Sequence, residues 1–274
     1  MEKVFAIFKR NLLIFINDRT RLIFSLIMPL FFLFIFSFVM NSAMSGMTQP
    51  MNYLISGIII MTVFQTSLNN SMNILEDIQS GFMKEIIVSP ISRWQISIGQ
   101  VLSSTAISVM QGVIVTALGF VIGLDMDAVH VLIMLAVMVI TGFAFSSLGL
   151  FLATLTRNSS SFQVLITVIV MPLTFLSGAY IPTTVMPSFM LPVILINPLT
   201  HITTIFRFIT MQMEGMSTAQ LLNLGVAFKI GGLTITPLFG LLMIVLFCVL
   251  FFSLCVHKFN KADFSTVKTY QNKH

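Results

Sequence analysis

Six long apolar runs constrain this chain more than any other feature. They cover approximately residues 22–40, 53–72, 95–124, 129–155, 161–180 and 236–256. A helix of about 20 apolar residues crosses the roughly 30 Å hydrocarbon core of a bilayer. Only 8% of the 274 residues are charged, whereas soluble domains average about 25%. The sequence therefore predicts an all-α integral membrane protein, with six transmembrane helices in one domain over residues 1–274.

The segment before the first run, residues 1–21, mixes charged and apolar side chains. On a helical wheel at about 100° per residue, one face collects Val4, Phe5, Phe8, Leu12, Phe15 and Ile16. Ile7, Leu13 and Ile14 fall outside that face. We expect a helix that lies in the membrane interface. The alternative is an undecorated basic flank of the first span.

Nearly all basic residues fall on one side of the predicted membrane. If the N-terminus lies inside, the outer segments contain only Arg207 and Lys229 of the 14 Lys and Arg residues. The positive-inside rule then places both termini in the cytoplasm of a multi-pass membrane protein. It also explains the net charge of +5 through the anionic membrane surface, so the charge gives no reason to expect a nucleic-acid partner.

A long segment, residues 181–235, separates the fifth run from the sixth and is broken by prolines at 182, 187, 192 and 198. Its pieces are too short to span a bilayer, which favours outer re-entrant or interfacial helices. We expect the two basic residues in it, Arg207 and Lys229, to extend toward the outer head groups. Contact with an anionic cargo is the alternative.

Several kinds of chemistry lack a motif in this sequence. No GxxxxGK[ST] pattern occurs, so a nucleotide that drives this protein would be bound by another polypeptide. The four histidines lack metal-ligand spacing, and Ser177 before Gly178 lacks the first glycine of a nucleophile turn. We expect no catalytic residue, metal or cofactor on this chain. Charged residues fall at the ends of the runs or in loops, which argues against an ion-coupled carrier.

The segment 74–94 is the most charged stretch inside the apolar chain. Its charged residues are Glu76, Asp77, Lys84, Glu85 and Arg93. Between the helix breakers Gly81 and Pro90, residues 82–88 can form a short helix with apolar and charged sides. Such a helix could dock on a soluble partner, with its charges setting the register. A solvated loop is the alternative, and Glu76 or Asp77 could instead cap or end the second span.

Two groups of residues resemble one transporter family. After the second run the sequence has Glu76-Asp77, Ser80-Gly81-Phe82, Lys84-Glu85 and Ser89-Pro90-Ile91-Ser92-Arg93. Near the fifth run it has Phe175-Leu176-Ser177-Gly178, Pro182, Pro187 and Asn197-Pro198-Leu199-Thr200. Together with the six-span layout, these features resemble the permease subunits of type-2 ATP-binding-cassette exporters, the ABC-2 family, and bacterial members in particular.

The resemblance implies a mechanism and its residues. Two permeases, either two copies or two paralogues, would pair above two cytosolic ATPase subunits that bind ATP and Mg²⁺. The loop helix would act as a coupling helix beside the N-terminal interfacial helix. The expected coupling residues are Glu76, Asp77, Gly81, Lys84, Glu85, Pro90 and Arg93. The expected outer gate consists of Gly178, Pro182, Asn197 and Pro198.

The sequence favours one cargo class without fixing it. The outer loop at residues 41–52 is small and polar, and no extra domain is visible. We therefore expect the cargo to be a small amphiphile such as a drug or antibiotic, exported across the plasma membrane. Such export would give the protein a role in antibiotic resistance. Polysaccharide or lipid-linked cargo is the alternative within the same mechanism. A membrane scaffold or assembly factor that transports nothing is the alternative from another class.

Overall fold

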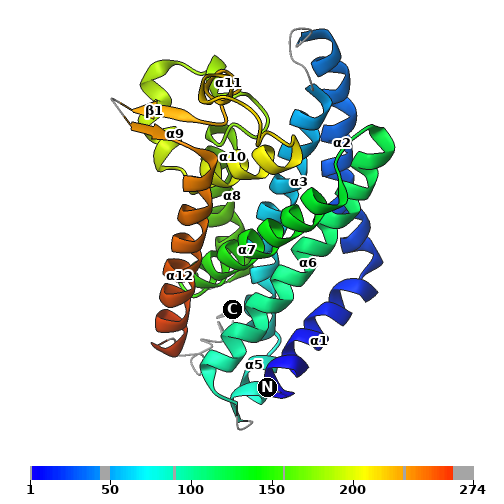
Figure 1. Cartoon of the computed structure of the whole chain (residues 1–274). Helices are drawn as coiled ribbons and strands as arrows, with labels where there is room; N and C mark the ends of the chain where they lie inside the picture. The colour runs from blue at the N-terminus through cyan, green and yellow to red at the C-terminus, as the bar shows by residue number, and fades with distance from the viewer. Residues whose placement is uncertain (1, 44–49, 89–90, 157, 231–232, 262–274) are drawn as a thin grey trace, which may run out of the picture.

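Helices dominate the computed structural model, which describes residues 2–43, 50–88, 91–156, 158–230 and 233–261 (Figure 1). The long ones are α1 (Glu2–Asn17), α2 (Arg19–Ala43), α3 (Pro50–Asn69), α6 (Arg93–Ile122), α7 (Ala128–Ala153), α8 (Ser159–Leu176), α10 (Pro198–Thr210) and α12 (Pro237–Lys261). The short ones are η1 (Asn70–Met72), α4 (Asn73–Gln79), α5 (Phe82–Val88), η2 (Thr183–Val185), η3 (Ser188–Met190), α9 (Leu191–Ile196) and α11 (Thr218–Asn223). The predicted all-α membrane fold is confirmed.

Among the described residues, five helical segments are long and apolar enough to cross a membrane: Met51–Gln79, Arg93–Ile122, Ala128–Ala153, Ser159–Leu176 and Pro237–Lys258. The bent pair Ser188–Ile196 and Pro198–Thr210 would make a sixth if it counted as one span. The predicted first run falls on α2, a helix of 25 residues. The second run extends through η1 into α4, which makes it longer than the sequence indicated.

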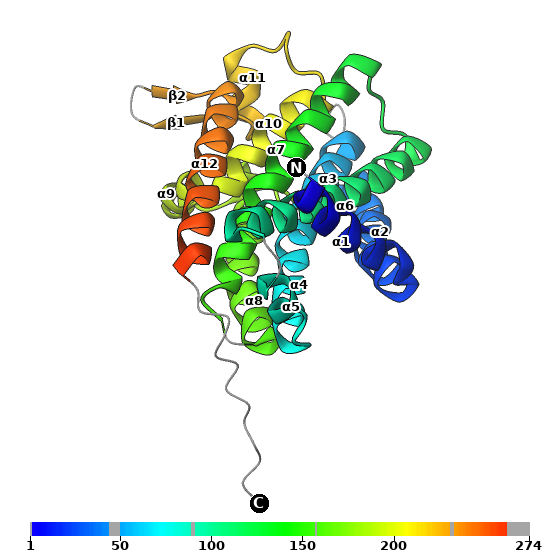
Figure 2. The same ribbon diagram turned by 90° about the horizontal axis from the view of Figure 1, so that it is seen from below.

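The helices differ greatly in how much of their surface other helices cover. The apolar part of Met51–Gln79 is 83% buried, whereas those of Ser159–Leu176 and Pro237–Lys258 are only 17% buried. Seen from below, α3 and α4 lie between α2 on one side and α12 on the other (Figure 2). Because α3 is central, residues that pack against its two ends are connected to each other through this one helix. The exposed apolar faces of α8 and α12 suit lipid or another membrane chain.

The N-terminal helix α1 packs along α6 through one face and leaves apolar residues of another face exposed. Its buried residues are Val4, Ile7, Asn11 and Phe15, whereas Phe5 is 62% exposed and Ile16 is 43% exposed. Hydropathy alone does not indicate the burial of Asn11, which is polar but has buried partners on α6. The exposed apolar side of α1 fits the predicted contact with membrane interface.

The segment between α8 and α12 forms the end of the bundle opposite α5. There η2, η3 and α9 lead into α10, and the chain bends by 89° at the break between α9 and α10. Pro198 occupies the first turn of α10, where its missing N–H costs nothing. The sequence did not predict the antiparallel hairpin of β1 (Phe228–Ile230) and β2 (Leu233–Ile235), because its strands have only three residues each.

Candidate functional site

A sharp turn reverses the chain where the central helix emerges from the bundle. Helix α4 ends at Gln79, Ser80 caps it, and Gly81 has a φ of +83° before α5 begins at Phe82. A residue with a Cβ atom would be strained by about 1–2 kcal/mol in this left-handed conformation. Gly81 therefore has the special backbone geometry that the sequence predicted, and α5 has the predicted bounds.

The short helix α5 presents one face to the bundle and another to its surroundings. Met83 and Ile86 are buried, whereas Glu85 is exposed. The side chain of Lys84 and the whole of Pro90 lie outside the described residues. An anchored helix with an exposed carboxylate has the form of a docking element, since its position is set by the bundle and its charge is available to a partner.

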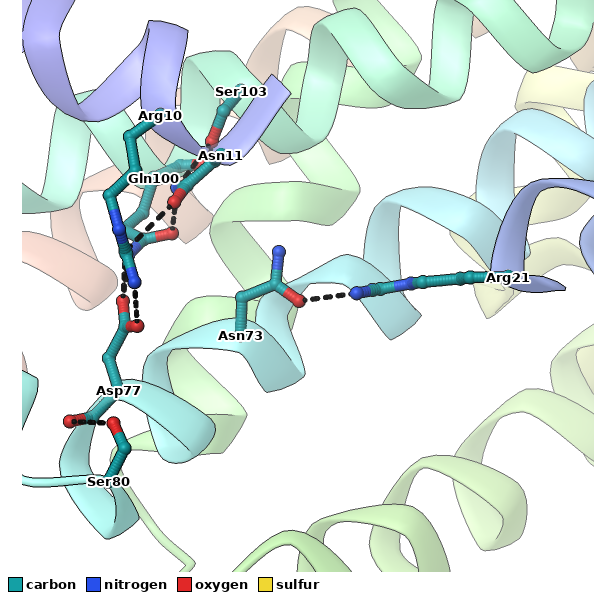
Figure 3. Close-up of polar contacts among 8 residues, drawn as sticks. All are labelled: Arg10, Asn11, Arg21, Asn73, Asp77, Ser80, Gln100 and Ser103. Carbon is teal, nitrogen blue, oxygen red and sulfur yellow. Dashed lines mark hydrogen bonds and ion pairs between the residues drawn. The ribbon is translucent and has the colours of Figure 1, made fainter. Parts of the chain in front are cut away.

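An ion pair holds the root of this turn to the N-terminal helix (Figure 3). Arg10 of α1 donates to both carboxylate oxygens of Asp77 in α4, at 2.6 and 2.9 Å. The Asp77 side chain is only 8% exposed, while that of Arg10 is 31% exposed. The Arg10 guanidinium also lies 3.9 Å above the ring of Phe82 in α5. One side chain of α1 thus fixes both helices on either side of the Gly81 turn.

Buried amides connect the ion pair to α6. The Gln100 amide donates to Asp77 Oδ2 at 3.3 Å. The Asn11 amide donates to Gln100 Oε1 at 2.7 Å and to Ser103 Oγ at 3.0 Å (Figure 3). The carboxylate of Asp77 consequently has an arginine and an amide as donors, and α1, α4 and α6 meet around it. We call the four residues Arg10, Asn11, Asp77 and Gln100 the Asp77 cluster.

A second arginine ties the next helix to the same region. Arg21 of α2 donates to Asn70 Oδ1 at 2.8 Å and to Asn73 Oδ1 at 3.0 Å. A shallow pocket of about 180 Å³ lies between α1 and α4, beside the ion pair. Its lining residues are Arg10, Asn11, Ile14, Asn73, Glu76, Asp77 and Ser80. This end of the bundle is therefore polar, partly open and crossed by contacts that join three helices to the central one.

The opposite end contains an arginine in a different environment. Arg207 of α10 is only 2% exposed. It donates to the hydroxyl of Tyr53 at 2.7 Å and to the carbonyl oxygen of Ala179 at 2.7 Å, and it lies 3.4 Å from the centre of the Tyr53 ring. The prediction that Arg207 extends toward head groups is wrong, because α10 is covered by α3, α7 and α12.

Comparison with known proteins assigns the fold to a family. The model of the ABC-2 type transporter matches residues 2–211. The chain belongs to the ABC-2 type transporter family. A relative from Cyanophora paradoxa that is named as a transport permease, ycf38, is 27% identical over 82% of this chain and 79% of its own length. One from Escherichia coli K12, named as a multidrug ABC transporter permease, YbhR, is 27% identical over 55% of this chain but only 41% of its own length.

A third relative agrees on the general activity. It is the inner membrane transport permease YhhJ of Escherichia coli K12, 27% identical over 47% of this chain and 34% of its own length. This chain is therefore an ABC-2 transport permease and a multi-pass membrane protein. The matches to YbhR and YhhJ cover less than half of the length of each relative.

The predicted coupling residues of this ABC-2 permease occupy distinct positions around the turn. Glu76 is exposed on α4, Glu85 is exposed on α5, and Arg93 is the half-exposed first residue of α6. Asp77 instead faces inward to Arg10. Both Glu76 and Asp77 lie inside α4 and do not cap it. No functional role was predicted for Arg10, Asn11 and Gln100. Their polar side chains among apolar neighbours in the sequence were the signal that could have identified them.

The predicted outer-gate residues surround the start of α10. Asn197 caps α10 by accepting from the N–H of Leu199 at 3.0 Å, and its amide donates to the carbonyl of Leu173 at 2.8 Å. Gly178, with a φ of +80°, lies in the turn after α8, and Pro182 precedes η2. These residues shape the connection from α8 to α10, next to the Arg207 contacts.

An ionic contact lies on the surface of the same end. His130 of α7 contacts Asp127 through Nδ1 and Glu214 through Nε2, the latter at 2.8 Å. The N–H of His130 also donates to Asp127 Oδ1 at 2.8 Å, which holds the pKa of that carboxyl below its usual range. This contact joins the turn between α6 and α7 to the loop after α10. Its two carboxylates are largely exposed, unlike Arg207, while the side chain of His130 is 16% exposed.

Proposed function

We propose that this ABC-2 permease is the transmembrane subunit of an ATP-driven exporter, with nucleotide and Mg²⁺ bound by separate cytosolic ATPase subunits. One observation carries the proposal. The α5 helix follows the central span, turns back at Gly81, and is anchored to α1 through Arg10 while Glu85 stays exposed. A force applied to α5 would be passed directly to α3 and α1.

In this proposal the exposed residues form the contact with the ATPase. Glu76, Glu85 and Arg93, together with Lys84 and Pro90, would meet the partner, while Gly81 fixes the turn. Asp77 would act indirectly by keeping α4 and α1 together. The α5 end would face the cytoplasm with both termini, as the distribution of basic residues supports. Gly178, Pro182, Asn197 and Pro198 would shape the outer gate.

A charge reversal at Glu85 tests the proposed contact. We expect Glu85→Lys to insert and fold normally but to lose stimulation of the ATPase by cargo, because a like charge would face the partner's basic side. The measurement is ATPase activity of the complete transporter in membrane vesicles, with and without cargo. Asp125→Lys is the matched control, since Asp125 is exposed at the opposite end. Normal cargo-stimulated turnover in Glu85→Lys would contradict the assignment.

We further propose a small amphiphilic cargo, such as a drug or antibiotic. The support is the small polar outer loop that the sequence predicts at residues 41–52 and the relative named as a multidrug permease. A polysaccharide or lipid-linked cargo remains the competing proposal. Cells that express the transporter should accumulate less of an amphiphilic dye than cells with the Glu85→Lys variant. Equal dye accumulation, together with a change in surface glycans or lipids, would favour the competing cargo.

The transporter would contain a second permease, either another copy or a paralogue. The exposed apolar faces of α8 and α12 support a partner within the membrane, since both segments are only 17% buried in the single chain. Purification with a tagged and an untagged copy tests the homodimer. Recovery of the untagged copy is expected for a homodimer, and its absence would favour a paired paralogue. A scaffold would co-purify without stimulating any ATPase.

A further inference from the structure

The buried arginine of α10 has neutral partners for a full positive charge. Tyr53 and Ala179 supply a hydroxyl and a carbonyl, and Arg207 Nε has no hydrogen-bond partner among the described residues. No carboxylate in the described part of the chain forms an ion pair with it. Burying an unpaired charge is costly, so a shorter or neutral residue would be the simpler choice if α10 needed only packing.

The surroundings of Arg207 are shaped to bring three segments together. Gly57 lies one turn after Tyr53 on α3, and a Cβ atom there would stand 2.2 Å from the carbonyl oxygen of Ala179 and 3.3 Å from Arg207 Nη2. The neighbouring Gly178 has a φ of +80°, a conformation that glycine adopts most readily. The absence of a side chain at position 57 therefore lets the carbonyl of Ala179 reach the guanidinium while α3 touches the turn.

The helix that binds Arg207 is continuous with the one that leads to α5. Residues Met51–Gln79 form one apolar helical segment of 29 residues, which passes through the 3₁₀ turn η1. Tyr53 lies near one end and Asp77 near the other, roughly 36 Å apart at 1.5 Å per residue. Each end contacts an arginine from a different element, Arg10 of α1 or Arg207 of α10.

We propose that Arg207 is a positioning residue for transport, which links the outer helix α10 to the central helix so that movement of α5 reaches the outer gate. The inference rests on the proposed export function. When α5 is displaced by its partner, α3 moves with it, and the two bonds from Arg207 carry α10 along. A buried guanidinium between neutral acceptors suits this role, because its bonds define one geometry and no carboxylate among the described residues locks it there.

The test uses the hydroxyl of Tyr53, since Tyr53→Phe keeps the ring that packs against Arg207 and removes only the acceptor. A single-cysteine transporter, with Cys248→Ser, Cys255→Ala and the reporter Thr183→Cys next to Gly178, is reconstituted with its ATPase in vesicles. The probe is a membrane-impermeant maleimide, applied from the outer side with and without ATP. Tyr180→Phe is the matched control, because Tyr180 is also at the α10 end but stacks on Phe32.

In the native background we expect ATP to change the labelling rate of the reporter. In Tyr53→Phe we expect the effect of ATP on the labelling rate to be about tenfold smaller, because a bond to a charged donor is lost and α10 no longer follows α3. Arg207→Lys should behave like Tyr53→Phe, since an ammonium lacks the planar fork that reaches both acceptors. Tyr180→Phe should behave like the native protein.

The outcomes separate the inference from the proposed function. If ATP changes labelling in the native protein and Tyr53→Phe and Arg207→Lys respond to ATP as the native protein does, the positioning role is overturned while export stands. If Tyr180→Phe changes the effect of ATP on the labelling rate as much as Tyr53→Phe does, Arg207 is a general packing residue and the inference fails. If ATP changes labelling in none of the proteins, including the native one, both the export function and the inference fail.

Discussion

The two arginine centres lie at opposite ends of one helix and use opposite solutions for a positive charge. At the α5 end Arg10 pairs with a carboxylate, and its side chain is 31% exposed. At the α10 end Arg207 is 2% exposed and is held by a hydroxyl and a carbonyl. A pair that water can reach tolerates the loss of one partner. A buried charge without a carboxylate depends on every contact that remains.

This difference indicates which interactions stabilise each end of the helix. At the α5 end water reaches Arg10, so the attraction between Arg10 and Asp77 is partly screened. The α10 end resembles a protein core, in which shape and complete hydrogen bonding decide the free energy. Substitutions at the two ends should therefore differ in size, and the difference should follow burial more than formal charge.

The largest loss should come from removing the buried guanidinium. Arg207→Ala should lower the free energy of unfolding by about 3 kcal/mol, because it leaves a cavity and two buried acceptors without donors. Thermal unfolding of the purified protein in detergent measures the loss. Arg19→Ala is the control, since Arg19 is exposed on α2. Equal stability of the two variants would contradict the interpretation of Arg207 as a core residue.

A smaller but still large effect is expected from one added methyl group. Gly57→Ala should cost about 2 kcal/mol, because its Cβ atom would overlap the carbonyl of Ala179, 2.2 Å away, and overpacking forces the backbone to shift. The same unfolding measurement applies. Gly215→Ala is the matched control, since no atom lies within 4 Å of the Cβ position there. If Gly57→Ala were as stable as Gly215→Ala, the close approach of α3 to the Ala179 turn would be refuted.

The ion pair of the α5 end should be less sensitive. Asp77→Asn should cost about 1 kcal/mol, a value reduced for the water that reaches Arg10, and the difference should shrink in high salt. Glu76→Gln is the neighbouring control, because Glu76 is exposed. We expect Glu76→Gln to leave the free energy of unfolding near the native value. A loss as large as that of Arg207→Ala would show that burial does not separate the two ends.

The smallest effect should come from the exposed contact at the α10 end. Asp127→Ala removes the partner of the His130 N–H and should lower the unfolding temperature slightly. Because the folded-state pKa of Asp127 is lowered, its contribution is present above the ordinary aspartate pKa of about 4 and is lost as the pH falls through the lowered value. The difference from the native protein should therefore persist in mildly acidic buffer and disappear only below a pH of about 4. A difference that disappears already in mildly acidic buffer would contradict this assignment.

The sequence by itself determined the class of fold and the place of its helices. Long apolar runs specify membrane helices because the cost of exposing polar backbone to lipid acts on each segment independently. Gly81 and the pattern of residues 82–88 likewise predicted a turn and a short helix, since both depend on neighbours in the chain. The ABC-2 resemblance rested on such local groups of residues and is confirmed by the family match.

Only the tertiary structure decided which charges meet and which are buried. Arg10 and Asp77 are 67 residues apart, and Arg207 and Tyr53 are 154 residues apart, so no local pattern pairs them. Hydropathy gives no sign that Asn11 of α1 is buried, because its partners lie on the distant helix α6. A side chain's polarity states its preference for water, but its actual environment depends on which helices cover it. Packing among distant segments decides that environment. It buries Arg207, which the sequence placed at the surface, beneath α3, α7 and α12.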